Sequence, residues 1–319
     1  MRAARPACAG ASPAMFRAFF IALSENRTLR AIAERSALGR RISRRFVAGM
    51  TVEDALEATA ATNARGMSVS VDNLGENVTN LEEARHSAQL YHEMIDALVD
   101  RKLDANVSLK LTHMGLDVDE RVSREIVSEV VAHAARRENF VRIDMEGSPY
   151  TQKTIDVVRE LHAQPGHAGR VGAVIQSYLR RSEEDVRQLC EEKTRIRLCK
   201  GAYKEPEEIA FQAKADVDAN FVKLMKILLE SGTYHGIATH DPKMIEATIA
   251  FARERNIPPD AFEFQMLHGV RRDLQEQLVR DGWRMRVYIP FGTEWYPYLM
   301  RRLAERPANV IFILKNLFK

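Results

Sequence analysis

Short apolar runs rich in β-branched residues recur along the chain after residue 65, and each is followed by a longer amphipathic stretch. The runs have the length of strands, whereas stretches such as Thr79–Val99 and Pro206–Leu229 carry apolar residues at the helical spacing of three and four. The eight predicted strands are Met67–Val71, Val107–Leu111, Val141–Met145, Val171–Ser177, Ile196–Cys199, Gly236–Thr239, Phe262–Met266 and Met285–Ile289. Strict alternation of strand and helix indicates parallel strands with right-handed crossovers, and eight such units favour an α/β fold closed as a (β/α)8 barrel.

A helical preface precedes the first predicted strand. Apolar residues at helical spacing run from Met15 to Val47, and a second helical segment begins at Thr51. We therefore expect an N-terminal helical extension over residues 1–64 and a barrel domain over residues 65–319, since a barrel takes about 250 residues. The alternative is an open doubly wound sheet, whose usual glycine-rich nucleotide turn has no match in this sequence.

Composition limits the classes of function. The 319 residues are 45% hydrophobic and 29% charged, which is typical of a globular protein with a large core. A net charge of +3 gives no reason to expect a nucleic-acid partner. The three cysteines lack the paired spacing of a zinc site or a disulfide framework, so a reducing compartment is expected. The arginines and alanines of the first 24 residues leave a transit peptide open as an alternative.

Polar residues gather where the predicted strands end, and a barrel places its active site at the carboxyl ends of its strands. In the segment 108–112 the alternation of a strand turns Lys110 into the barrel and the neighbouring leucines towards the helices. The same alternation turns Asp144 inward on the next strand, so we expect the two side chains to form an ion pair. Whether that pair is structural or functional stays open.

The last helical segment carries a second group of charges. From Pro297 onwards, Tyr298, Arg301 and Arg302 lie three and four residues apart and so share one face. Two guanidinium groups beside Tyr298 and Tyr288 would suit a small carboxylate with an apolar body. The alternative is a solvated basic face.

Lys200 has two interpretations. It could form a Schiff base, as in barrel aldolases, or it could help to hold an anion together with Arg197 and the closely approaching backbone of Gly201. A phosphate-bearing cofactor fits the second interpretation best. The histidines His235 and His240 belong to no ligand cluster, so no metal is expected.

These strand-end segments together resemble the proline dehydrogenase family, in particular its short monofunctional bacterial members. The matching segments are 72–76 (DNLGE), 108–112 (SLKLT), 142–146 (RIDME), 176–178 (QSY), 197–203 (RLCKGAY), 238–241 (ATHD), 262–265 (FEFQ), 288–292 (YIPFG) and 295–305 (WYPYLMRRLAE). They follow one another at the spacing of the family, from about residue 47 to near the C-terminus.

The resemblance implies non-covalent FAD and oxidation of L-proline to Δ1-pyrroline-5-carboxylate, with hydride passing to the flavin N5 and electrons leaving to a membrane quinone. The implied substrate ligands are Lys110, Tyr288, Tyr298, Arg301 and Arg302. The implied FAD contacts are Met145, Gln176, Arg197, Lys200, Gly201, Ala202, Thr239 and His240. Asp144, Arg197 and Tyr203 are the implied catalytic residues. Glu76 would form a gate over the substrate with a helix arginine.

The resemblance also sets expectations about partners and place. The next step would need a separate pyrroline-5-carboxylate dehydrogenase chain, and we expect a cytoplasmic location with peripheral contact to the inner membrane left open. The apolar stretch 310–319 favours packing on the barrel over docking on lipid. Two other functions remain as alternatives: a Schiff-base lyase (aldolase) that uses Lys200 or Lys110, and a silent barrel that only binds. The silent barrel is disfavoured because Lys110, Asp144, Arg301 and Arg302 are all present.

Overall fold

The computed structural model describes residues 36, 39 and 43–305, with side chains up to residue 300. The chain divides into two compact units. One unit is Ala48–Gly292, and the other combines Met1–Val47 with Thr293–Lys319. The units are described separately below.

The first unit is a closed barrel of eight parallel strands in the order of the chain. The strands are β1 (Ser68–Asn73), β2 (Ala105–Leu109), β3 (Val141–Ile143), β4 (Val171–Gln176), β5 (Arg195–Cys199), β6 (His235–Ala238), β7 (Phe262–Leu267) and β8 (Met285–Phe291). Pairing of β1 with β8, with Ser70 opposite Tyr288, closes the barrel. The predicted fold is confirmed, and every predicted strand lies within two residues of an observed one.

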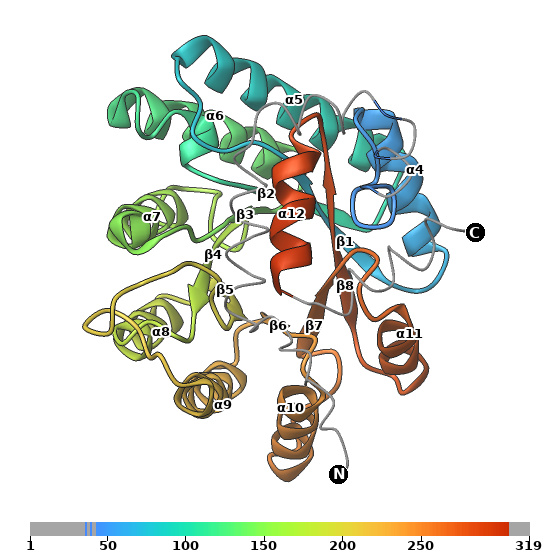
Figure 1. Cartoon of the computed structure of the whole chain (residues 1–319), viewed down its shortest axis with the longest axis vertical. Helices are drawn as coiled ribbons and strands as arrows, with labels where there is room; N and C mark the ends of the chain where they lie inside the picture. Colours follow the sequence, from blue (N-terminus) through green and yellow to red (C-terminus); the bar gives the residue numbers. More distant parts are fainter. Residues whose placement is uncertain (1–35, 37–38, 40–42, 306–319) are drawn as a thin grey trace, which may run out of the picture. The chain divides into compact units, whose positions relative to one another are not determined.

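Helices surround the strands (Figure 1). They are α4 (Val52–Asn63), α5 (Leu81–Asp100), α6 (Glu120–Arg136), α7 (Ser148–His162), α8 (Ser182–Glu191), α9 (Lys214–Glu230), α10 (Pro242–Glu254) and α11 (Arg272–Arg280), with the 3-10 turn η1 (Thr112–Met114) after β2. The helix expected from Pro206 is wrong in its first part, because α9 begins at Lys214. Residues 209–211 instead bond to the backbone after β4: Arg180 N donates to Ile209 O at 2.9 Å and Phe211 N to Tyr178 O at 2.8 Å.

The helix that begins after Thr51 is confirmed as α4. The Thr51 side chain accepts a hydrogen bond from Asp54 N at 3.1 Å, and Asp54 bonds back to Thr51 N at 2.9 Å, which is a capping box. This helix packs against β1 and β8 within the unit of the barrel. The division expected at residue 64 stays a prediction, and most of the helix expected over residues 15–47 lies outside the described residues.

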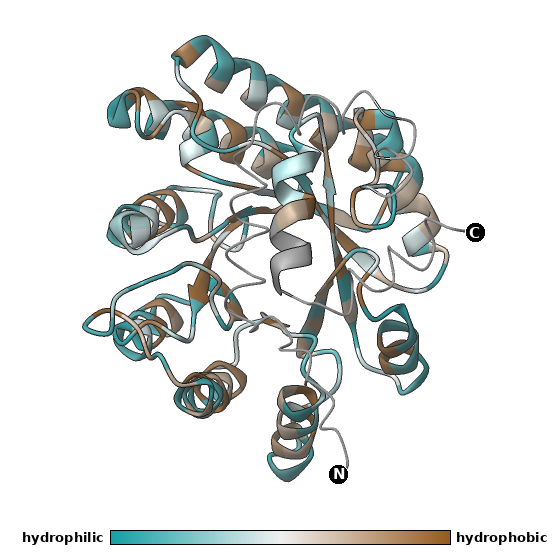
Figure 2. Cartoon of the chain, in the orientation of Figure 1, coloured by the Kyte–Doolittle hydropathy of each residue, from teal (hydrophilic) through white to brown (hydrophobic). Residues whose placement is uncertain are grey.

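Side chains alternate along the strands between an apolar and a polar surface. Outward residues such as Val69, Val107 and Ile143 are fully buried in one apolar core together with the inner faces of the helices. Figure 2 shows this arrangement as brown helix faces towards the strands and teal faces outside. Inward residues are polar and also buried: Ser70, Ser108, Arg142, Arg197, Glu263, Gln265 and Arg286. The barrel interior is therefore a hydrogen-bonded column, and buried polar groups of this kind must be paired to be tolerated.

The second unit contributes one described helix, α12 (Trp295–Glu305), as the spacing from Pro297 predicts. Trp295, Tyr296 and Tyr298 are buried, and the rings of Trp295 and Tyr296 meet edge to face at 6.1 Å. Among the helices of the described residues, none has both the length and the apolar character needed to cross a bilayer.

Candidate active site

Arg197 on β5 lies at the centre of the polar column. Its Nε donates to Gln265 Oε1 at 2.5 Å and its Nη1 to Asp144 Oδ1 at 2.7 Å. Its Nη2 donates to the hydroxyls of Ser70 and Ser108, both at 3.1 Å. Five strands thus contribute to the position of one guanidinium group, whose side chain is only 7% exposed. A side chain bonded through all three nitrogens has a single orientation before any ligand binds.

Asp144 lies between this guanidinium group and a phenol. The Tyr288 hydroxyl donates to Asp144 Oδ2 at 2.8 Å, and the Arg197 Cζ lies 5.1 Å from the centre of the Tyr288 ring. Burial, and next the Asp144 carboxylate, raise the pKa of Tyr288 well above its usual value. The phenol therefore stays protonated and holds the second carboxylate oxygen in place.

Lys110 pairs with Asp72 rather than with Asp144, so the ion pair expected from the sequence is wrong. The Lys110 Nζ lies 3.2 Å from Asp72 Oδ2, while Asp144 binds Arg197 and Tyr288. The β1–β2 register puts Asp72 opposite Ser108, two residues before Lys110 on the same inward row. Asp144 remains close enough to act on Lys110 through space.

The Lys110–Asp72 pair is charged at neutral pH. Burial raises the pKa of Asp72 to about 6, although the Lys110 ammonium opposes this shift. Burial lowers the pKa of Lys110, but Asp72, Glu76 and Asp144 outweigh it, so the pKa lies well above the usual value. Lys110 is therefore a permanent cation with a surplus of negative charge around it. Its ammonium group can still donate a hydrogen bond to a carboxylate group that enters the site, but further cations are needed to balance that charge.

Lys200, after β5, belongs to an electroneutral cluster. Its Nζ lies 2.5 Å from Asp218 Oδ1 and 2.7 Å from Asp241 Oδ2, and Lys214 bonds to the same two carboxylates. A Schiff-base lysine must be a neutral amine. The surroundings of Lys110 stabilise its ammonium form, and Lys200 is paired with two carboxylates; neither arrangement suits a Schiff-base nucleophile.

The ends of β4 and β5 carry one buried hydrogen-bond acceptor without a partner among the described residues and one glycine whose backbone packs closely against a tyrosine ring. Gln176 donates through Nε2 to Met145 O at 3.3 Å, but its buried Oε1 has no hydrogen-bond partner among the described residues. Gly201 has φ +106°, and a Cβ there would lie 2.2 Å from the ring of Tyr178. Only glycine allows the backbone to come this close. This surface can accept a hydrogen bond from a flat ligand and contact it through the main chain.

Five further predicted residues lie at the same end of the barrel. Thr239 and His240 directly follow β6, and His240 Nε2 accepts the backbone N–H of Leu267 at 2.9 Å. Ala202 and Tyr203 follow Gly201, and Tyr203 is 40% exposed. Glu76 is half-buried in the loop after β1. The barrel thus brings together the predicted residues that come from its own strands.

Glu205 is a site residue that the sequence analysis missed. Its carboxylate accepts hydrogen bonds from Ser148 N at 2.7 Å and Ser148 Oγ at 2.6 Å, at the start of α7. The N-cap of α7 is Gly147, which has no side chain to cap the helix. Glu205 supplies that cap from another loop and so ties the segment that carries Tyr203 to α7. Gly147 before the helical segment was the sequence feature that could have indicated a cap supplied from elsewhere in the chain.

Arg301 and Arg302 lie in α12, but their side chains are outside the described part of the chain. Their expected role, and the gate that Glu76 would form with either of them, therefore stay predictions. Tyr298 is buried in the same helix.

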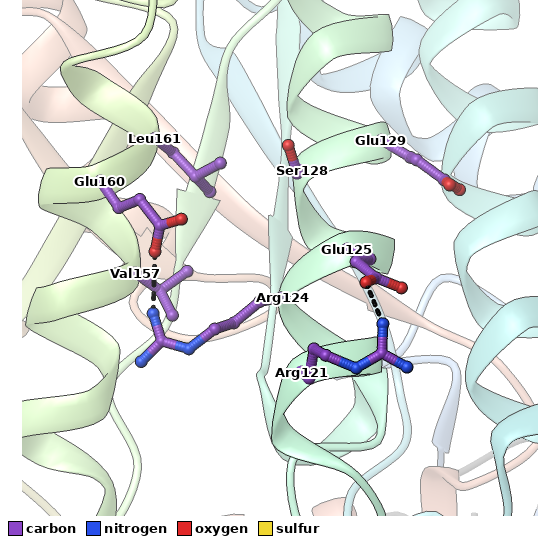
Figure 3. A pocket seen from close by; sticks show the side chains of 8 residues that line it. All are labelled: Arg121, Arg124, Glu125, Ser128, Glu129, Val157, Glu160 and Leu161. Carbon is purple, nitrogen blue, oxygen red and sulfur yellow. Dashed lines mark hydrogen bonds and ion pairs between the residues drawn. The ribbon is translucent and has the colours of Figure 1, made fainter.

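A groove on the outside of the barrel is not a candidate for the chemistry. It lies between α6 and α7; Arg124 of α6 pairs with Glu160 of α7 across it at 2.9 Å, and Arg121 pairs with Glu125 along α6 at 2.5 Å (Figure 3). It is far in the fold from the inward row of strand residues. Within the described residues, no group of three or more His, Cys, Asp or Glu side chains is placed to hold a metal.

Comparison with known proteins gives a consistent result. The family profile described as "Proline dehydrogenase" matches residues 55–315. "Proline dehydrogenase 1" of Bacillus subtilis subsp. natto is 40% identical over 306 residues, which is 96% of this chain and 100% of that protein. "Proline dehydrogenase" of Deinococcus radiodurans is 38% identical over 281 residues, covering 87% of this chain and 90% of that protein.

A solved structure is also similar. It is proline utilization A (PutA) from Bdellovibrio bacteriovorus inactivated by N-propargylglycine, with a TM-score of 0.80 and 28% identity. The likeness covers 91% of this chain but only 36% of that one, so this chain corresponds to about a third of the solved protein.

Proposed function

Because the chain belongs to the proline dehydrogenase family, we propose that it oxidises L-proline to Δ1-pyrroline-5-carboxylate with non-covalent FAD and passes the electrons to a membrane quinone. The observation that carries this proposal is the buried group of Arg197, Asp144, Tyr288 and Lys110 at the carboxyl ends of the strands. In a (β/α)8 barrel that end is where catalysis takes place.

The proposed substrate site holds the proline carboxylate by cations and the proline ring by aromatic side chains. Lys110 and the two arginines of α12, Arg301 and Arg302, are the proposed carboxylate ligands, and Tyr288 and Tyr298 the proposed ring contacts. Support comes from the surplus negative charge around Lys110, which keeps it protonated. Its weak 3.2 Å contact with Asp72 leaves donors for a second carboxylate.

The residues at the ends of β3 to β6 fit an FAD molecule. The unpaired Oε1 of Gln176 suits an N–H donor of the flavin ring, and the Gly201 backbone, which packs closely on the Tyr178 ring, shapes the surface beside it. The remaining proposed FAD ligands are Met145, Arg197, Lys200, Ala202, Thr239 and His240. Lys200 would position this surface as well as contact the cofactor, because Asp218 and Asp241 already neutralise it.

The side chains account for what the oxidation of proline requires. The carbon beside the nitrogen loses hydride only when the amine is neutral and its lone pair can stabilise the developing iminium group. FAD supplies the two-electron acceptor when it is bound. The Arg197 and Lys110 cations near the substrate amine would favour its neutral form. Asp144, fixed by Arg197 and Tyr288, would orient the site, and Tyr203 would lie beside the substrate.

Two further proposals concern partners. The product would pass to a separate pyrroline-5-carboxylate dehydrogenase chain. A quinone acceptor would require peripheral contact with the inner membrane by a protein that is otherwise cytoplasmic.

The visible absorption spectrum of the purified protein, recorded with and without L-proline in the absence of oxygen, tests the proposal. We expect flavin bands that bleach with L-proline and not with D-proline. A bound flavin whose bands do not bleach with L-proline would show that the proposed substrate is wrong. A colourless protein that does not bind added FAD would show that the proposed cofactor is wrong as well.

A further inference from the structure

A second polar cavity opens at the amino ends of the strands, which is the opposite mouth of the barrel from the candidate active site. It has a volume of about 360 Å³ and is called the amino-end pocket here. Its lining consists of Ser68, Asp104, Gly169, Arg195, Tyr234, Arg284 and Arg286. Because all eight strands are parallel, their first residues meet at this end. Nothing in the proposed oxidation uses the pocket.

Arg195 is the unusual member of this lining. Its guanidinium group lies over the rings of Phe140 and Tyr234, at 4.5 Å and 4.9 Å from their centres. It makes no hydrogen bond and no ion pair with any described residue, and its buried Nε has no partner. The other arginines inside the barrel all donate hydrogen bonds, for example Arg286 to Glu263 at 2.7 Å. A half-buried guanidinium group without an acceptor is costly unless a ligand supplies one.

The charges around the pocket leave the cations in excess. Arg284 is exposed, and its guanidinium carbon lies 5.7 Å from the centre of the Tyr234 ring, which Arg195 also contacts. Of the three acids nearby, Asp260 acts on Arg284 through space, and Glu263 is bonded to Arg286, Gln265 and Tyr234.

The third acid, Asp104, accepts the Ser68 hydroxyl at 2.6 Å. Arg170 and Arg142 add positive charge, and both donate to backbone carbonyls rather than to acids. Burial, Arg286 and Arg170 together lower the pKa of Arg195 despite Glu263. Within the described residues none of these three carboxylates forms an ion pair with Arg195 or Arg284.

We propose that the amino-end pocket is a binding site for a small, multiply charged oxyanion such as inorganic phosphate, held between the guanidinium groups of Arg195 and Arg284. A guanidinium fork matches the oxygens of such an anion, and both guanidinium groups lie against the Tyr234 ring, which brings them to the same pocket. The pocket is large enough for the anion and several waters. Asp104 repels the anion, so the affinity is in the millimolar range.

Phosphate binding to the FAD-loaded protein tests this proposal, because the diphosphate of FAD then fills its own site. Titration calorimetry at constant ionic strength, with chloride as the balancing anion, should give one phosphate site. Arg195→Met and Arg284→Met should each raise the dissociation constant at least fivefold. Asp104→Asn should lower it severalfold, because it removes the opposing charge.

Arg121→Met is the matched control. Arg121 is 75% exposed at the start of α6, at the carboxyl end of the barrel, so its loss removes one positive charge away from the pocket. Its phosphate affinity should equal that of the wild type. The proposal would be overturned if the wild type bound no phosphate at concentrations up to 50-fold above about 1 mM, or if Arg195→Met and Arg284→Met both kept the wild-type affinity for phosphate. Arg284 is exposed, so its variant keeps the test valid even if Arg195→Met does not fold.

Discussion

Replacing Gly201 with alanine measures how closely the backbone after β5 must approach its neighbours. Gly201 has φ +106°, where a residue with a side chain costs about 1–3 kcal/mol. The new Cβ would stand 2.2 Å from Cδ1 of Tyr178, whose ring is 7% exposed and packs with Leu179 and Ala210. Overpacking of this kind costs about another 1–3 kcal/mol. The total is about 2–6 kcal/mol.

The chain can relieve this strain by shifting residues 200–202, which would move Lys200 and the proposed FAD surface. We therefore expect the dissociation constant for FAD to rise at least about 30-fold, as a loss of about 2 kcal/mol implies. Flavin fluorescence quenching measures the affinity, and thermal unfolding by circular dichroism measures the stability of the apoprotein.

Gly232→Ala is the matched control. Gly232 has φ +73° in the turn between α9 and β6, and its Cβ would have no atom within 4 Å. It should lose about 1–2 kcal/mol of stability from backbone strain alone, with the FAD affinity unchanged. If Gly201→Ala bound FAD within threefold of the wild type and lost no more stability than Gly232→Ala, the argument from close approach would be wrong.

Three other changes test the remaining parts of the site. The pKa of Asp72 is raised to about 6 in the folded protein against about 4 when unfolded, so protonated Asp72 contributes fully to folding stability below pH 4 and this contribution is lost as the pH rises through 6. Urea unfolding between pH 4 and 7 should show this loss in the wild type and not in Asp72→Asn. The same pH profile of stability in both proteins would contradict the reasoning. Tyr288→Phe removes the 2.8 Å hydrogen bond to Asp144 and should cost about 1.5–3 kcal/mol in chemical denaturation, whereas no measurable change would show that Arg197 alone holds the carboxylate. Glu205→Gln should destabilise the protein by about 0.5–2 kcal/mol and raise KM for proline, because the segment that carries Tyr203 is then held less firmly. Glu208 lies on the same loop but is exposed, so Glu208→Gln should change neither the stability nor KM.

The strands could be predicted from the sequence because their two surfaces have different compositions. Val69, Val71 and their equivalents face the helices, while Ser70 and Asp72 face the barrel axis, so a period of two is visible even in a fully buried strand. The partner of Lys110 could not be predicted in the same way. Alternation shows that a side chain points inward, but it does not show which of two inward carboxylates lies nearer.

The choice between Asp72 and Asp144 depends on competition within the barrel. Asp144 is bonded to Arg197 and Tyr288, which come from strands far along the chain. Asp72 remains for Lys110. Loop contacts such as that of Glu205 with Ser148 have no periodic signal at all, because they depend on how two βα loops fold across each other. Sequence reasoning thus placed Lys110 and Asp144 inside the barrel but misassigned the partner of Lys110.

The polar interior explains how such a site can be positioned without a ligand. Gln265, Asp144, Ser70 and Ser108 come from four different parts of the barrel wall, and the Arg197 guanidinium group is bonded to all four. Holding these charges in the barrel costs desolvation energy that an apolar interior would not require. The gain is that Asp144, Tyr288 and Arg197 are fixed by β-strands rather than by loops, which hold side chains less rigidly. If the proposed FAD site is right, the loops after β5 and β6 would adapt to the cofactor without disturbing the groups proposed to face the substrate.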